Sequence, residues 1–166
     1  MAEKQTFAFQ SVPDNAEQLK QLPEASLDSP FKTAALAMLA FLKFGEDPES
    51  VWGMLDFLKG PETVSPFEKQ FFRDRLKGKE YKAASFFEGA SVQNGYTPSR
   101  PLRITVEDNP YSYSTENYAV LYVRSAGADS PRPVKLRKKP STGQWFINEM
   151  QCFADIRVPA EADPWA

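Results

Sequence analysis

Three segments in the first half of the sequence begin and end with the same residue types, and these favour α-helices. Each starts with Ser or Asp followed by proline and stops at a glycine. The side-chain oxygen accepts from free N–H groups of a first turn, proline suits the first helical position, and glycine suits a left-handed last residue. The sequence therefore predicts helices from Asp28-Ser29-Pro30 to about Gly45, from Asp47-Pro48 to Gly60, and from Ser65-Pro66 to Gly78.

The three predicted helices differ in how their apolar residues are distributed. The segment 34–42 is apolar on every side, which indicates a central buried helix. It is much shorter than the roughly 20 apolar residues of a membrane span. The other two helices are amphipathic, so we expect them to cover the central one.

After Gly78 the apolar residues recur at every second position, which is typical of β-strands. Strands are predicted over 102–107, 118–123, 134–137 and 144–150. The short connections between the later strands favour an antiparallel meander. The sequence thus predicts one α+β domain over 1–166, with three N-terminal helices packed on one face of a C-terminal antiparallel sheet.

The order of helices and strands resembles the cone-shaped nuclear-transport-factor-like fold, which hosts unrelated functions. Segments 1–25 and 81–101 show no dominant period, although 6–10 has the pattern of an edge strand. Later in the chain, a four-residue loop over 140–143 sets the register of a hairpin. The predicted pairs are Lys139–Gln144, Lys138–Trp145, Arg137–Phe146 and Leu136–Ile147. A slip by one residue would break up the apolar face, so this register should be firm.

The composition excludes several kinds of chemistry. The chain has no histidine and a single cysteine, Cys152, in an apolar stretch that predicts burial. A Ser-His-Asp triad, an intrachain disulfide and a Cys- or His-rich metal site therefore cannot form. We expect no catalytic residue, no metal and no cofactor. The net charge of −2 disfavours nucleic acid and anionic membranes as partners, and the first residues lack a signal-peptide pattern, so we expect a cytoplasmic protein.

The strongest charge cluster is a basic strip that follows a turn at Asp129-Ser130. We interpret these two residues as turn formers, because a hydroxyl becomes nucleophilic only with a base in hydrogen-bond reach. The strip contains Arg132, Lys135, Arg137, Lys138 and Lys139. Period two places Lys135, Arg137 and Lys139 on one strand face, as donors to phosphate or carboxylate groups. A solvated strand face is the plainer interpretation, and we expect Arg132 to have a fixed partner.

A second candidate surface is the tyrosine-rich loop 109–118, which carries Tyr111 and Tyr113. The loop is polar, so we expect it to be exposed. Tyrosine provides a large contact area at a small cost in conformational entropy, which suits a protein contact.

Several motifs together resemble a family of uncharacterised bacterial proteins that is defined only as a domain of unknown function. They are FLKGP (57–61), FFRDR (71–75), YTPSRP (96–101), GADSPRPVKLR (127–137), GQWF (143–146) and IRVPAEADPWA (156–166). The resemblance covers the chain from about residue 27 onward. It implies a bacterial cytoplasmic protein and assigns no catalytic residues.

These observations favour a non-catalytic binding or protein-interaction domain of unknown role in the bacterial cytoplasm, with another protein or a small molecule as its partner. The alternative is a small-molecule-binding protein or enzyme with a pocket between helices and sheet. Nucleic-acid binding through the basic strand and nearby aromatic residues is the weakest hypothesis.

Overall fold

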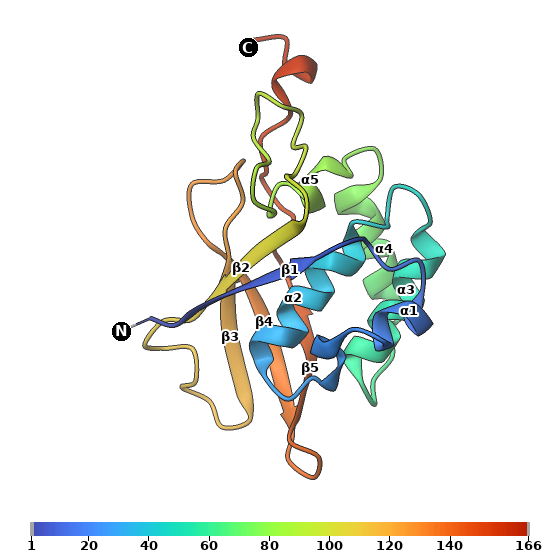
Figure 1. Ribbon diagram of the computed structural model, residues 1–166, viewed down its shortest axis with the longest axis vertical. Coiled ribbons are helices and arrows are strands. Elements are labelled where there is room, and N and C mark those ends of the chain that lie inside the picture. The colour runs from blue at the N-terminus through green and yellow to red at the C-terminus, as the bar shows by residue number, and fades with distance from the viewer. Residues whose placement is uncertain (1, 166) are drawn as a thin grey trace.

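The computed structural model describes residues 2–165, so Met1 and Ala166, the ends of the expected 1–166 domain, lie outside the described residues. Five antiparallel strands form one sheet in the order β1-β2-β3-β4-β5 (Figure 1). They are β1 (Lys4–Phe9), β2 (Leu102–Glu107), β3 (Tyr118–Val123), β4 (Arg132–Lys139) and β5 (Gln144–Met150). The chain is α+β, with its main helices before the β2–β5 meander, as predicted. The expected N-terminal edge strand is β1.

The three predicted helices are α2 (Pro30–Phe41), α3 (Pro48–Lys59) and α4 (Pro66–Leu76). Each has its expected cap, since the side chains of Ser29, Asp47 and Ser65 accept from backbone N–H groups of the first turn. At α4, Glu68 completes a capping box. Shorter helices were not predicted; they are α1 (Ala16–Lys20), η1 (Pro23–Ser26), α5 (Tyr81–Ala84) and η2 (Ala160–Ala162).

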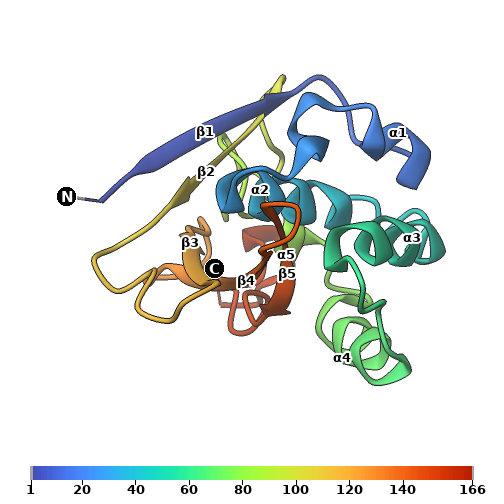
Figure 2. The ribbon, with the colours of Figure 1, turned by 90° about the horizontal axis from the view of Figure 1, so that it is seen from below.

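Helix α2 is the centre of the core, as its all-round apolarity predicts. It contacts all five strands, and residues 34–41 are fully buried. Helix α3 packs against α2 and β5, and α3 and α4 lie beyond the β5 edge (Figure 2). The Phe72 ring of α4 lies 4.9 Å from that of Phe41 and 6.4 Å from that of Trp52. Within residues 2–165, no helix has the length and apolarity to cross a membrane.

The β4–β5 hairpin has the predicted register from Lys139–Gln144 to Leu136–Ile147. A β-bulge then shifts the pairing by one residue, so that Lys135 faces Glu149. The bulge was not predicted. It bends the strand pair locally and strengthens its twist.

Residues 81–101, which the sequence did not place, help to fill a gap in the sheet. β2 and β3 share only two residue pairs. Beyond them, the Glu88 N–H donates to the Arg103 carbonyl and the Ala126 N–H donates to the Ser85 carbonyl, each at 2.9 Å. This segment therefore supplies backbone partners where the β2–β3 ladder stops.

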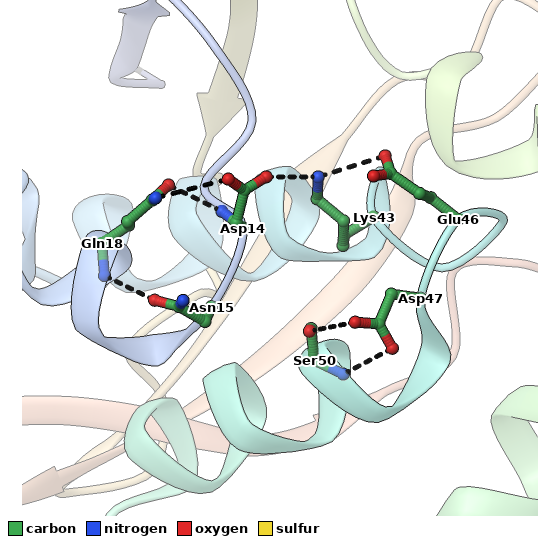
Figure 3. A network of polar contacts seen from close by, with 7 residues as sticks. All are labelled: Asp14, Asn15, Gln18, Lys43, Glu46, Asp47 and Ser50. Carbon is green, nitrogen blue, oxygen red and sulfur yellow. Dashed lines mark hydrogen bonds and ion pairs between the residues drawn. The ribbon is translucent and has the colours of Figure 1, made fainter.

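A polar network around Lys43 ties the segment before α1 to the α2–α3 turn (Figure 3). The Lys43 side chain is only 8% exposed, and its ammonium lies 2.8 Å from Asp14 Oδ1 and 3.2 Å from Glu46 Oε2. The bond to Asp14 raises the pKa of Lys43 above its ordinary 10.5, against the lowering effect of burial. The same bond lowers the pKa of Asp14 below its ordinary 3.8.

Candidate binding site

Lys135 and Arg137 lie on the sheet face opposite α2. Their neighbours Val134 and Leu136 are fully buried on the α2 side, so strand alternation places the two cations on the outer face. Both cations flank the ring of Tyr118 on β3, with Nζ of Lys135 at 5.9 Å and Cζ of Arg137 at 5.8 Å from its centroid. Two of the five cations of the basic strip thus lie beside one aromatic ring.

Arg132 has a different environment at the other end of β4. Strand alternation places Arg132 on the same sheet face as the buried residues Val134 and Leu136. Its Nε is buried and has no hydrogen-bond partner among the described residues. The guanidinium donates to the carbonyl of Asp155 and to the hydroxyl of Ser130, each at 3.3 Å. It therefore has the expected fixed partners, and they tie it to the fold.

Tyr111 and Tyr113 are exposed on the loop between β2 and β3. Burial of the Tyr113 hydroxyl, together with the nearby carboxylate of Asp108, raises the pKa of Tyr113 to about 12. Within residues 2–165, neither tyrosine makes a cation–π contact with Lys135 or Arg137. Within the described residues, the cation–π contacts therefore join the basic strip to Tyr118, the last residue of the segment 109–118, and not to Tyr111 or Tyr113.

Arg137 also lines a pocket of about 210 Å³ between the hairpin and the end of α3, which we call the hairpin pocket. Its apolar lining includes Phe146 and Ile147 of β5, together with Pro61 and Pro140. Its charged lining comprises Lys59, Glu62, Arg137, Lys138 and Lys139. The pocket therefore combines an apolar lining with an excess of cations.

Gly60 is the residue that lets the end of α3 approach the hairpin. Its φ of 73° lies in the left-handed region, and a Cβ on it would lie 2.7 Å from the Phe146 ring. Any other residue would be strained and would collide with that ring. Gly60 thereby places Pro61 and Glu62 beside the hairpin.

Most of the positive charge at the hairpin pocket is uncompensated. Lys59 is the exception, because its buried ammonium lies 2.8 Å from Glu68 Oε2. Burial disfavours the Glu68 carboxylate, but hydrogen bonds from Lys59 and the Ser65 N–H outweigh that effect and lower its pKa. Arg137 lies 3.8 Å from Glu62, and both side chains are more than half exposed, so solvent weakens the pair.

Lys138 and Lys139 have no carboxylate within 4.0 Å anywhere in the described part of the chain. The Lys138 ammonium instead lies 6.0 Å from the ring centroid of Trp145, the contact that the register predicted. The hairpin pocket thus presents cations that an anionic partner can neutralise.

A second pocket, of about 350 Å³, lies at the gap between β2 and β3 and contains Glu107, Arg124, Ser85 and Ser125. Glu107 forms an ion pair with Arg124. The two serine hydroxyls lie 2.7 Å apart, and that of Ser85 donates to the Lys82 carbonyl. These groups have partners within the fold, and among the described residues no base forms a hydrogen bond with either hydroxyl, so we assign them a structural role.

Other titratable groups offer little for chemistry. Burial raises the pKa of the Cys152 thiol to about 12, so it is protonated and inert at neutral pH. Among residues 2–165, no three Cys, Asp or Glu side chains converge as metal ligands.

Sequence reasoning placed Phe146 beside Arg137 through the predicted register, but it missed the other residues that complete the site, which are Tyr118, Lys59 and Glu62. One signal pointed to them. Gly60-Pro61 marks a sharp exit from α3, but nothing in that signal says which strand the exit approaches.

The comparisons with known proteins give a family. No curated protein and no solved structure shows a significant match. A family model, described as domain of unknown function DUF6935, matches residues 11–160. That range contains every residue of the hairpin pocket and four of the five strands. The match covers most of the sequence, so the chain belongs to the DUF6935 family of domains of unknown function.

Proposed function

We propose that this chain is a non-catalytic binding domain whose hairpin pocket receives an acidic segment of another protein. One observation carries the proposal: Arg137, Lys138 and Lys139 surround an apolar pocket and have little compensating charge. The net charge of the chain is −2, so this is a local departure from its average. Such cations attract carboxylates, and arginine binds them with two parallel hydrogen bonds.

The size of the pocket supports a protein segment in preference to a large free ligand. Its volume of about 210 Å³ is below the roughly 300–1,000 Å³ of typical small-molecule sites. A side chain or two of a bound segment fit such a space, with flanking carboxylates near the rim lysines. The aromatic ring of Phe146 supplies an apolar contact.

A small-molecule site enclosed between α2 and the sheet, which would suit the alternative reading, has no support. Helix α2 and the strand residues that face it are almost completely inaccessible, including Leu36, Leu39, Ile104, Leu121 and Leu136. The two pockets described above lie elsewhere, at the hairpin and at the β2–β3 gap.

A fluorescence-anisotropy titration tests the proposal with a labelled peptide of sequence Asp-Glu-Trp-Glu-Asp. We expect binding to the wild type that weakens with added salt, because exposed charges are screened. The double variant Arg137→Glu with Lys139→Glu should weaken it at least about tenfold, equivalent to about 1.4 kcal/mol.

The matched control is Lys77→Glu with Lys79→Glu, which makes the same change of charge at exposed lysines after α4. This variant should bind the peptide like the wild type. Equal loss in both variants would reveal only a net-charge effect and refute a defined site. Tight binding of a single-stranded RNA decamer, abolished by the pocket variant alone, would replace the protein partner with nucleic acid.

A further inference from the structure

The segment 161–165, which we call the acidic tail, extends away from the body of the molecule (Figure 1). The Ala160 N–H donates to the Val92 carbonyl at 2.9 Å. Beyond that bond, the backbone N–H groups of the tail that donate hydrogen bonds do so only to residues 159–163. The Trp165 side chain is 91% exposed, a large apolar surface left in solvent.

The acidic tail has the chemistry that the hairpin pocket lacks. It carries the carboxylates of Glu161 and Asp163 and the Trp165 indole within five residues, and it contains no cation. A cavity of about 150 Å³ can hold a benzene ring, so about 210 Å³ gives room for an aromatic side chain. The indole matches the apolar lining, and the carboxylates match Arg137 and Lys139.

The family comparison separates the two surfaces. The matched region ends at residue 160, so it contains the hairpin pocket and excludes the acidic tail.

We propose that the acidic tail of a second copy of this chain occupies the hairpin pocket; this inference rests on the proposed binding function. Figure 1 places the tail and the tip of the β4–β5 hairpin at opposite ends of the molecule, so a tail does not reach its own pocket. Each copy then offers a pocket and a tail. Such a contact forms closed rings, of which a two-fold dimer with exchanged tails is the smallest, or open chains.

The first test uses a labelled peptide with the sequence of residues 157–165. We expect it to bind the full chain, and to lose at least about tenfold in affinity on Arg137→Glu with Lys139→Glu. The same peptide with Trp165→Ala should also bind less tightly. If the pocket variant binds the tail peptide as tightly as the wild type does, the assignment of the tail to this pocket is overturned. The same holds if the peptide with Trp165→Ala binds as tightly as the unchanged peptide.

The second test follows the self-association of the full chain by sedimentation velocity. Because the contact is small, it should be weak, so the average mass should rise only as the concentration approaches about 1 mM at low salt. Trp165→Ala should remove this rise without unfolding the protein, since the indole makes no buried contact. A copy with Glu161→Lys and Asp163→Lys should also stay monomeric.

Mixing two non-associating variants sharpens the second test. The tail variant Glu161→Lys with Asp163→Lys keeps an intact pocket, and the pocket variant Arg137→Glu with Lys139→Glu keeps an intact tail. Their mixture should associate, because the intact tail meets the intact pocket and the two reversed surfaces also attract each other. A mixture that stays monomeric under conditions where the wild type associates would overturn the proposal.

The outcomes separate this inference from the function on which it rests. If the wild type binds the Asp-Glu-Trp-Glu-Asp peptide yet stays monomeric and ignores the tail peptide, the pocket binds an acidic partner that is not this chain. If neither peptide binds, both proposals fail.

Discussion

The Lys43 network and the hairpin pocket both gather charged side chains at a corner of the fold, but they use charge differently. Lys43 is nearly buried and lies between the carboxylates of Asp14 and Glu46. Lys138 and Lys139 lie on the pocket rim, without a carboxylate within 4.0 Å in the described residues. The charge of Lys43 is compensated within the fold, whereas the charges of Lys138 and Lys139 are not.

This difference suggests what each cluster contributes. A buried charge that is hydrogen-bonded on both sides fixes the position of the elements it joins, and losing a partner is costly. Solvated cations cost little to keep and little to lose, so their effect on stability is small. Unpaired cations instead become useful when an anionic partner neutralises them. We therefore assign a binding role to the hairpin and a structural role to Lys43.

The largest effect should come from reversing the charge of Lys43. Lys43→Glu places a third carboxylate beside Asp14 and Glu46 at a nearly buried position, and we expect a loss of about 3 kcal/mol in the free energy of unfolding. Arg137→Glu makes the same charge change among cations and should cost under ~1 kcal/mol. Urea denaturation of both variants checks the contrast; equal losses would remove the distinction between the clusters.

The backbone of the hairpin pocket should be more sensitive than its charges. Gly60 and Gly78 have similar φ values of 73° and 74°, but only a Cβ on Gly60 meets a neighbour, the Phe146 ring. Gly78→Ala should therefore cost about 1 kcal/mol for the left-handed backbone alone. Gly60→Ala should cost about 2–3 kcal/mol because the ring must also move. Comparable melting temperatures for the two variants would contradict the close approach.

The pH dependence of stability should also differ between the clusters. The folded pKa of Asp14 lies below 3.8, so its contribution is present above that pH and disappears as the pH falls through the folded value. The folded pKa of Lys43 lies above 10.5, so its contribution is lost only as the pH rises beyond that value.

Lys43→Met should therefore lower the melting temperature by a constant amount across neutral pH, and the deficit should shrink below pH 3.8. Arg137→Gln should show no such convergence. A deficit of Lys43→Met that persists unchanged in acid would mean that packing, and not the ion pair, is responsible.

The smallest expected effect is on stability when the outer face of β4 is reversed. Lys135→Glu with Arg137→Glu removes two contacts with the Tyr118 ring and should change the free energy of unfolding by under ~1 kcal/mol. The fold should remain intact by circular dichroism while acidic-peptide binding is lost. A larger loss of stability would make these residues structural.

Much of the fold could be predicted from patterns that involve only residues close together in the sequence. The start of α4 could be predicted from Ser65, Pro66 and Glu68 alone, because a helix cap involves only residues of the first turn. The pairing of Arg137 with Phe146 likewise follows from a short loop and alternation. The bulge beside Lys135 was missed, since a one-residue insertion leaves no mark on so short a pattern.

The candidate site was only partly predictable. Arg137 stood out by charge, but the pocket exists because Gly60 brings Pro61 and Glu62 beside the hairpin from a distant part of the sequence. Arg132 belonged to the same basic strip, yet it is tied to the carbonyl of Asp155. A charge pattern in the sequence indicates which residues are solvated. It does not show that the turn after α3 lies against the β4–β5 hairpin, because that position depends on how the helices pack.

The position of β1 has a consequence for how the chain folds. β1 is made from residues 4–9, but its strand partner in the described part of the chain is β2, and Lys4 pairs with Glu107. Helices α1 to α5, together with η1, are therefore enclosed in a single long loop that must close before this ladder forms. Loop closure over such a span is slow, because its entropic cost is paid before the contacts form. On the ribosome, β1 leaves the exit tunnel long before β2, so it finds its partner only after the whole helical segment between them has emerged.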